Sequence, residues 1–145
     1  MVNKQLRPAA SFLLFLNFCM YAVVLGICGW AMNRMINYGS VGGGQNAATV
    51  YFVIFSLIAG AVGAVSCLFG LNHVAYWGPD SLPAAAAAGA IAWSLTMLAL
   101  GFASKHIRLH TDSHRLKTLE AFIIILSGTM LLYIGAIHGA IKRGN

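Results

Sequence analysis

The chain has 145 residues, and its composition excludes an ordinary soluble domain. Hydrophobic residues make up 59% of it and charged residues 8%, whereas a soluble domain carries roughly 25% charged residues. A soluble protein with so few charges would lack the groups that keep its surface hydrated. Lipid is therefore the expected surrounding of most of this chain.

Nine basic and three acidic residues fall into short patches, which leave charge-free runs at 8–33, 35–79, 81–104 and 121–141. A membrane-spanning helix needs about 20 apolar residues, and each run contains one such stretch. A β-barrel is excluded because stretches such as 122–126 are apolar on every side, whereas barrel strands alternate. We predict an all-α, four-transmembrane-helix bundle, a single membrane domain with short loops and the spans Ala9–Asn33, Ala47–Leu71, Leu82–Ser104 and Leu119–Ile141.

The link between the third and fourth spans is the most basic segment of the chain. We expect it to run from about Lys105 to Thr118, with Thr118 as the N-cap of the last helix and Glu120 in its first turn. Basic residues at such a link lie near lipid phosphates. The residues expected to do so here are Lys105, Arg108, Arg115 and Lys117.

Four spans place both termini on the same side of the membrane. The side with the termini carries four basic residues and the other side carries five, so the total gives no orientation. The first helix has two basic residues before it and one after it. This difference favours cytoplasmic termini.

Small residues recur at helical spacing in the second and fourth spans. In lipid, helices associate through close backbone approach, which small residues permit. We interpret these residues as packing positions within the chain; the alternative is an interface with a second copy or with another membrane protein. They are Ser56, Gly60, Gly63, Ala64, Gly135 and Gly139.

The predicted spans contain no Asp, Glu, Lys or Arg in their interiors, and the one histidine inside a span, His138, lies within a turn of its end. Ion-coupled transporters and proton pumps usually have an ionisable residue there, so these functions are disfavoured. Uncharged polar side chains remain. They predict hydrogen bonds between helices or, alternatively, a path for a small neutral molecule. The side chains concerned are Asn17, Ser94, Thr96, Ser127 and Tyr133.

His106, His110 and His114 recur every four residues and would share one face of a helix. Three imidazoles beside Asp112 are a donor set that zinc or copper accepts. The flanking basic residues repel a cation, so a solvated link is the preferred interpretation and no metal is predicted. No catalytic or phosphate-binding pattern is present, and we predict a non-enzymatic protein without a cofactor and without nucleic-acid binding.

A family resemblance is carried by residues 51–64, 81–86, 92–96, 98–101, 116–126, 132–134 and 137–139, of which 116–126 is the most specific. These stretches resemble the AWPM-nineteen-like family of plant plasma-membrane proteins. The resemblance implies a plant plasma-membrane protein associated with abscisic acid, cold, drought or desiccation, some members being proposed to help abscisic acid enter cells. It transfers no binding or catalytic residue, because the family has no agreed motif of that kind.

Two functions follow as expectations. In the first, the protein lets a small amphipathic molecule pass, such as protonated abscisic acid. In the second, it is an accessory or scaffolding subunit that packs against a membrane-protein partner or forms a homo-oligomer. A polar cavity between helices would favour the first function, and an outward-facing stripe of small residues would favour the second.

Overall fold

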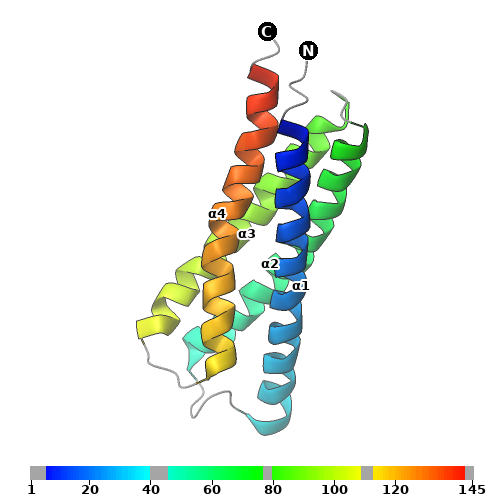
Figure 1. Cartoon of the computed structure of the whole chain (residues 1–145). Helices are drawn as coiled ribbons and strands as arrows, with labels where there is room; N and C mark the ends of the chain where they lie inside the picture. The colour runs from blue at the N-terminus through cyan, green and yellow to red at the C-terminus, as the bar shows by residue number, and fades with distance from the viewer. Residues whose placement is uncertain (1–5, 40–45, 77–79, 109–112, 143–145) are drawn as a thin grey trace.

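The computed structural model describes residues 6–39, 46–76, 80–108 and 113–142. It contains four long α-helices that run up and down side by side (Figure 1): α1 (Leu6–Tyr38), α2 (Ala47–Tyr76), α3 (Leu82–Arg108) and α4 (His114–Lys142). Each is long and apolar enough to cross a membrane. The predicted four-helix membrane bundle is thus confirmed.

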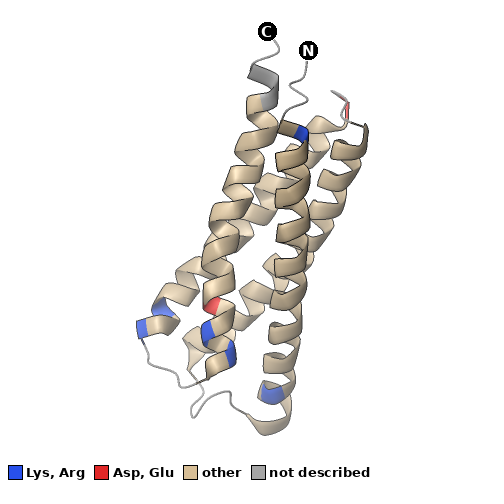
Figure 2. Ribbon diagram, in the orientation of Figure 1, with Lys and Arg blue, Asp and Glu red and all other residues tan. Residues whose placement is uncertain are grey.

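Neighbouring helices in the bundle are α1 with α2, α2 with α3, α3 with α4, and α4 with α1. The start of α1, the end of α2, the start of α3 and the end of α4 lie at one end, which we call the terminal end (Figure 1). The other ends of the four helices lie opposite. We call that end the basic end, because the described Arg34, Lys105, Arg108, Arg115 and Lys117 belong to these helix ends, and Figure 2 shows basic residues gathered there.

All four helices are longer than the spans expected from the sequence. The apolar helices that include the spans have 26 to 33 residues, whereas about 20 residues cross the hydrocarbon core. The excess turns extend into the headgroup region or are accommodated by tilt. The largest difference is at the α3–α4 link.

The expected position of Thr118 as the N-cap of the last helix is wrong. α3 continues to Arg108, and α4 begins at His114, preceded by Ser113, whose carbonyl accepts the N–H groups of Leu116 and Lys117. Thr118 lies inside α4 and donates its hydroxyl to the His114 carbonyl at 3.0 Å. The added turn is stabilised by burial of Leu116, which has no exposed surface.

Two tyrosine side chains cross the interior of the bundle over glycines of α2. A Cβ added at Gly63 would overlap the ring of Tyr21 from α1. A Cβ added at Gly70 would overlap the hydroxyl of Tyr133 from α4. Gly63 and Gly70 are seven residues apart, or about two helical turns, and therefore lie on the same face of α2. The absence of a side chain at these two positions leaves room for the ring of Tyr21 and for the hydroxyl of Tyr133.

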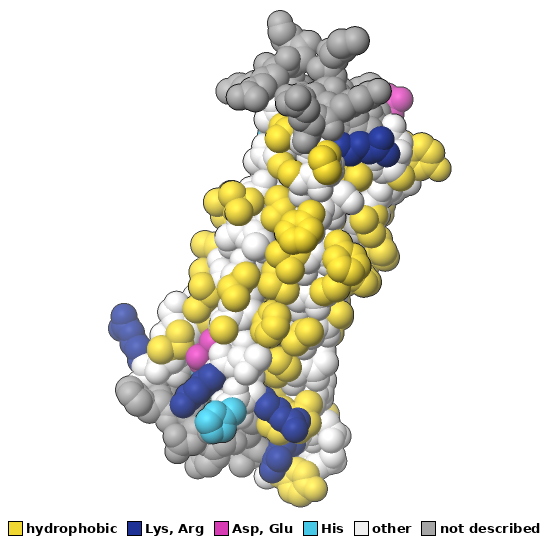
Figure 3. All heavy atoms as spheres, viewed as in Figure 1, with side chains coloured by type: hydrophobic (Ala, Val, Ile, Leu, Met, Phe, Trp, Pro, Cys, Tyr) yellow, Lys and Arg dark blue, Asp and Glu magenta, His cyan; other side chains and the backbone are white. Residues whose placement is uncertain are grey.

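Large apolar side chains cover the outside of the bundle. Phe12 and Phe15 are each 66% exposed, and Leu132 is 64% exposed. Figure 3 shows such side chains over most of the length of the molecule between its ends. An exposed apolar belt of this extent is expected where the surrounding medium is lipid rather than water.

Candidate functional site

The middle of the bundle contains a polar contact that joins opposite helices. The hydroxyl of Tyr21 lies 2.9 Å from Oγ1 of Thr96, and both side chains are fully buried. Thr96 donates its own proton to the carbonyl of Ala92 at 2.8 Å. Tyr21 is therefore the donor in the contact between α1 and α3.

Asn17 is one helical turn from Tyr21 and is also fully buried. Its Nδ2 donates to the thioether sulfur of Met130 on α4 at 3.3 Å, and its Oδ1 has no partner. A thioether is a weak acceptor. The amide of Asn17 is thus poorly satisfied by the protein, although its burial is costly.

Three further buried hydroxyls on other helices have no hydrogen-bond partner, those of Ser56 and Ser66 of α2 and of Tyr133 of α4. Ser56 is ten residues, or almost three turns, from Ser66 and lies nearer the basic end. Leu14 and the Tyr133 hydroxyl both approach Gly70. Ser66 is four residues from Gly70, and Asn17 is three residues from Leu14, so Asn17, Ser66 and the Tyr133 hydroxyl lie at similar heights along the bundle. We call the unpartnered oxygens of Asn17, Ser66 and Tyr133 the polar triad.

The structure divides the five polar residues singled out from the sequence. Asn17, Thr96 and Tyr133 are buried inside the bundle. Ser94 is exposed and donates to the carbonyl of its own helix at Ala90, 2.8 Å away. Ser127 likewise donates to Ile124, at 2.7 Å. Ser94 therefore faces outward and does not line a path through the interior.

The residues expected to pack helices also differ in their surroundings. Ser56, Gly60 and Gly63 are buried on α2, and Ala64 is half-buried. A Cβ at Gly60 would lie 3.1 Å from the Leu25 side chain of α1. Gly135 and Gly139 of α4 have no such neighbours: nothing lies within 4 Å of an added Cβ at either. These two glycines do not bring described helices of the chain together.

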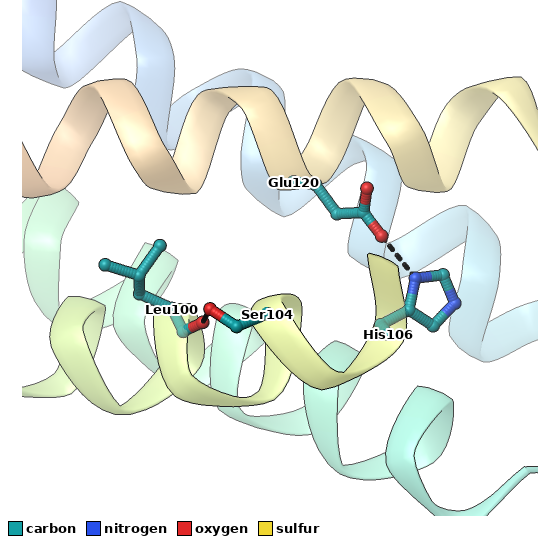
Figure 4. A network of polar contacts seen from close by, with 4 residues as sticks. All are labelled: Leu100, Ser104, His106 and Glu120. Atoms are coloured by element: carbon teal, nitrogen blue, oxygen red, sulfur yellow. Dashed lines mark hydrogen bonds and ion pairs between the residues drawn. The ribbon is translucent and has the colours of Figure 1, made fainter. Parts of the chain in front are cut away.

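A buried polar pair lies near the basic end (Figure 4). Nδ1 of His106 on α3 is bonded to Oε1 of Glu120 on α4, and His106 is 1% exposed. Phe52 of α2 stacks on the imidazole with ring centroids 5.5 Å apart. A bond to a carboxylate requires a proton on Nδ1, and Nε2 of the same ring has no partner. Three helices thus meet at one histidine.

This pair was not predicted from the sequence. From the sequence, His106 is expected in a solvated link and Glu120 in the first turn of the last helix. The expectation of span interiors without ionisable groups rested on the shorter spans and does not describe these longer helices. His114 is exposed on α4 rather than on α3, so it shares no helical face with His106.

His110 and Asp112 lie outside the described residues. Among the residues that the structure describes, no three His, Cys, Asp or Glu side chains are grouped closely enough to hold a metal ion. The interpretation of the histidine spacing as a metal site therefore finds no support in the described part of the chain.

The four basic residues expected near lipid phosphates are all exposed at the basic end (Figure 2). The guanidinium of Arg115 lies 4.3 Å from the centre of the Trp30 ring of α1, and that of Arg34 lies 5.4 Å from the same ring. Lys105 and Arg108 border a separate open depression of about 530 Å³ on α3. The cations thus lie where a headgroup layer would meet the bundle.

Arginine and histidine contacts also join the helices at the terminal end. Arg7 of α1 donates to the carbonyls of Val74 and Ala75, at 2.9 and 3.2 Å, where α2 ends. A guanidinium at this position satisfies carbonyls that have no partner within their own helix and lies at the negative end of the helix dipole. Nδ1 of His73 lies 2.8 Å from the hydroxyl of Ser81, just before α3.

Comparison with known proteins agrees with the resemblance. The model of the AWPM-19-like family matches residues 15–140. A rice protein (Oryza sativa subsp. japonica) named membrane protein PM19L is 46% identical over 142 residues, covering 96% of this chain and 82% of its own length. No solved structure matches. The matched residues include all four helices almost completely, and the chain belongs to the AWPM-19-like family.

Proposed function

We propose that the protein acts in the plasma membrane in the plant response to abscisic acid and water stress. In this proposal it lets a small neutral molecule, such as protonated abscisic acid, pass between its helices. The polar triad carries the proposal. Each buried polar group without a partner costs about 1–3 kcal/mol, and a solute with hydroxyl or carbonyl groups would supply the missing partners.

The charges of the bundle favour a neutral solute over an anion. A carboxylate in a bilayer needs a desolvated cation or a helix N-terminus to hold it. The described cations lie at the ends of the bundle, and the four helices are continuous. No half-helix end therefore points at the polar triad. A carboxylic acid would pass in its protonated form, downhill and without a coupled ion.

The rings of Tyr21 and Tyr133 fill the interior of the bundle next to the polar triad, to which the Tyr133 hydroxyl belongs. The axis of the bundle is therefore closed in this conformation. Passage would require these side chains to change rotamer. In hydrogen bonds this breaks only the neutral contact of Tyr21 with Thr96, which contributes about 1 kcal/mol, because the hydroxyl of Tyr133 has no partner.

Uptake into proteoliposomes tests the proposal, with empty liposomes subtracted because the neutral acid also crosses lipid. Protein-dependent uptake of labelled abscisic acid is expected to rise as external pH falls toward the pKa of the acid. It should not depend on sodium concentration or on membrane potential. Tyr133→Phe removes one member of the polar triad and keeps the ring, and it should lower this uptake about fivefold. Ser94→Ala removes an outward hydroxyl and is the matched control.

Two results would contradict the proposal. Uptake that accelerates with an inside-positive potential at fixed pH would mean that the anion crosses. Equal uptake by the Tyr133→Phe and Ser94→Ala variants would mean that the polar triad takes no part in passage.

The outer face of α4 favours a second candidate, an accessory or scaffolding subunit. Gly128 and Gly135 are seven residues apart and exposed, and nothing lies within 4 Å of an added Cβ at either. A partner helix could approach this face closely. Gly135→Leu should then leave the thermal unfolding of the purified chain unchanged but abolish its association with a copurifying membrane protein or with a second copy. Unchanged association would exclude this face as the interface.

A further inference from the structure

A groove between α1 and α4 at the basic end combines an apolar floor with a charged rim. It is open on one side, has a volume of about 330 Å³, and is lined by Gly26, Ile27 and Trp30 of α1 and by Arg115 and Thr118 of α4. The groove is hollow because nothing lies within 4 Å of a Cβ added at Gly26. Gly26 is one turn farther from the basic end than Trp30. The apolar part of the groove thus extends toward the middle of the membrane.

Two positive charges meet at the rim of this groove. The guanidinium groups of Arg115 and Arg34 both lie against the indole ring of Trp30, at 4.3 and 5.4 Å from its centre. Stacking of this kind occupies the face of a guanidinium and leaves its in-plane N–H groups available. Two like charges held around one ring repel each other, and a bound anion would relieve that repulsion.

The described part of the chain supplies no anion at this place. Glu120 is the one described carboxylate at the basic end, and it points inward to His106 (Figure 4). Figure 3 shows dark blue basic side chains at this end directly beside the apolar surface. Charge complementarity therefore calls for a negatively charged group from outside the described residues.

The geometry points to an anionic phospholipid as the occupant: we propose that Arg115 binds its phosphate and that the groove toward Gly26 receives the upper part of an acyl chain. A soluble anion would use the rim and leave the apolar floor unfilled. Thr118 adds no donor, since its hydroxyl is bonded to the His114 carbonyl. Arg115 and Arg34 are thus the phosphate-binding groups. This inference does not depend on the transport proposal.

Fluorescence quenching of Trp30 by brominated lipid tests the proposal in nanodiscs. A chain with Trp77→Phe and Trp93→Phe retains Trp30 as its one tryptophan. At equal mole fraction, brominated phosphatidic acid should quench Trp30 more strongly than brominated phosphatidylcholine. Arg115→Gln should remove this difference. For each variant, the fluorescence in brominated lipid is divided by the fluorescence in unbrominated lipid. Lys105→Gln, an equal change of charge on α3, is the matched control and should preserve it.

Trp93 donates its Nε1–H to the Ser127 carbonyl at 3.1 Å, so the single-tryptophan chain can lose stability. Native mass spectrometry of the full chain with its own tryptophans gives an independent measurement. Phosphatidic acid retained on the protein should fall about fivefold in Arg115→Gln relative to Lys105→Gln.

Three results would overturn the proposal. Equal quenching by the two brominated lipids would show that no anionic lipid is selected. Equal losses of phosphatidic acid binding in the Arg115→Gln and Lys105→Gln variants would show that the net charge of the basic end alone attracts the lipid. Displacement of the brominated phosphatidic acid by millimolar glycerol phosphate would show a site for a soluble phosphate instead of a lipid.

Discussion

Replacing Gly63 by alanine tests how the middle of the bundle is packed. Where space allows, alanine favours a helix over glycine by about 1 kcal/mol. At Gly63 the new Cβ would overlap the ring of Tyr21, which is fully buried and can move away only by displacing its own neighbours. We expect overpacking to dominate and to lower the free energy of unfolding by about 1–3 kcal/mol. Thermal unfolding of the purified protein in detergent measures the effect.

Gly128→Ala is the matched control, because the same change is made on a lipid-facing side where nothing lies within 4 Å. It should leave stability unchanged or raise it by up to about 1 kcal/mol. In a Tyr21→Leu background the ring is absent, and Gly63→Ala should then cost at least about 0.5 kcal/mol less than in the parent. Equal behaviour of Gly63→Ala and Gly128→Ala, or the same cost with and without the Tyr21 ring, would refute the packing described here.

Two further predictions concern the histidines near the basic end. Glu120→Leu should lower the free energy of unfolding by roughly 1–3 kcal/mol because it leaves His106 buried without its partner, whereas Glu120→Leu combined with His106→Leu should cost less than the sum of the single changes. Additive losses in this double-mutant cycle would show that the two side chains do not interact. Equilibrium dialysis should detect no zinc bound more tightly than micromolar, and stoichiometric zinc that is lost in a His106→Ala, His110→Ala variant would contradict this.

The helices were predictable because lipid imposes a simple constraint on sequence. Every backbone polar group within the bilayer must be paired, and long charge-free stretches then allow only helices. What the charge pattern did not reveal was where the helices end. Charged residues such as Lys105 and Glu120 are taken as the limits of the charge-free stretches. In the structure α3 continues beyond Lys105 and α4 begins before Glu120, because His106 and Leu116 are buried in the bundle.

The error in the helix ends explains why the pair of His106 and Glu120 was missed. Placed in a link, the two residues appear as ordinary solvated groups. Placed on α3 and α4, they are 14 residues apart across a tight helical hairpin and lie opposite each other. Glu120 is four residues after Leu116 and three before Ile123, both fully buried, so it lies on the inward face of α4. This spacing was the available signal.

The packing stripes were predicted as small residues, but their partners were not. Small-residue motifs suggest two helix backbones in contact. In the structure, Gly63 and Gly70 instead receive aromatic side chains that reach across from α1 and α4. Sequence spacing identifies which positions are small, whereas the identity of what fills the space depends on rotation and tilt of the other helices. Gly135 and Gly139 are four residues apart, as Gly60 and Ala64 are, and nothing lies within 4 Å of a Cβ added at either.

The distribution of interhelical contacts has a consequence for how any solute would enter. At the terminal end, Arg7 joins α1 to the last carbonyls of α2, and at the basic end His106 joins α3 to Glu120 of α4. Hydrogen bonds to charged groups are worth about 1.5–3 kcal/mol, more than the neutral contacts of the middle. The middle has the tyrosine rings and the polar triad instead. Separation of whole helices would therefore break the strongest contacts first, whereas rotation of Tyr21 and Tyr133 breaks one neutral hydrogen bond. Counted by hydrogen bonds alone, movement of these two side chains therefore costs less than separation of the helices at either end.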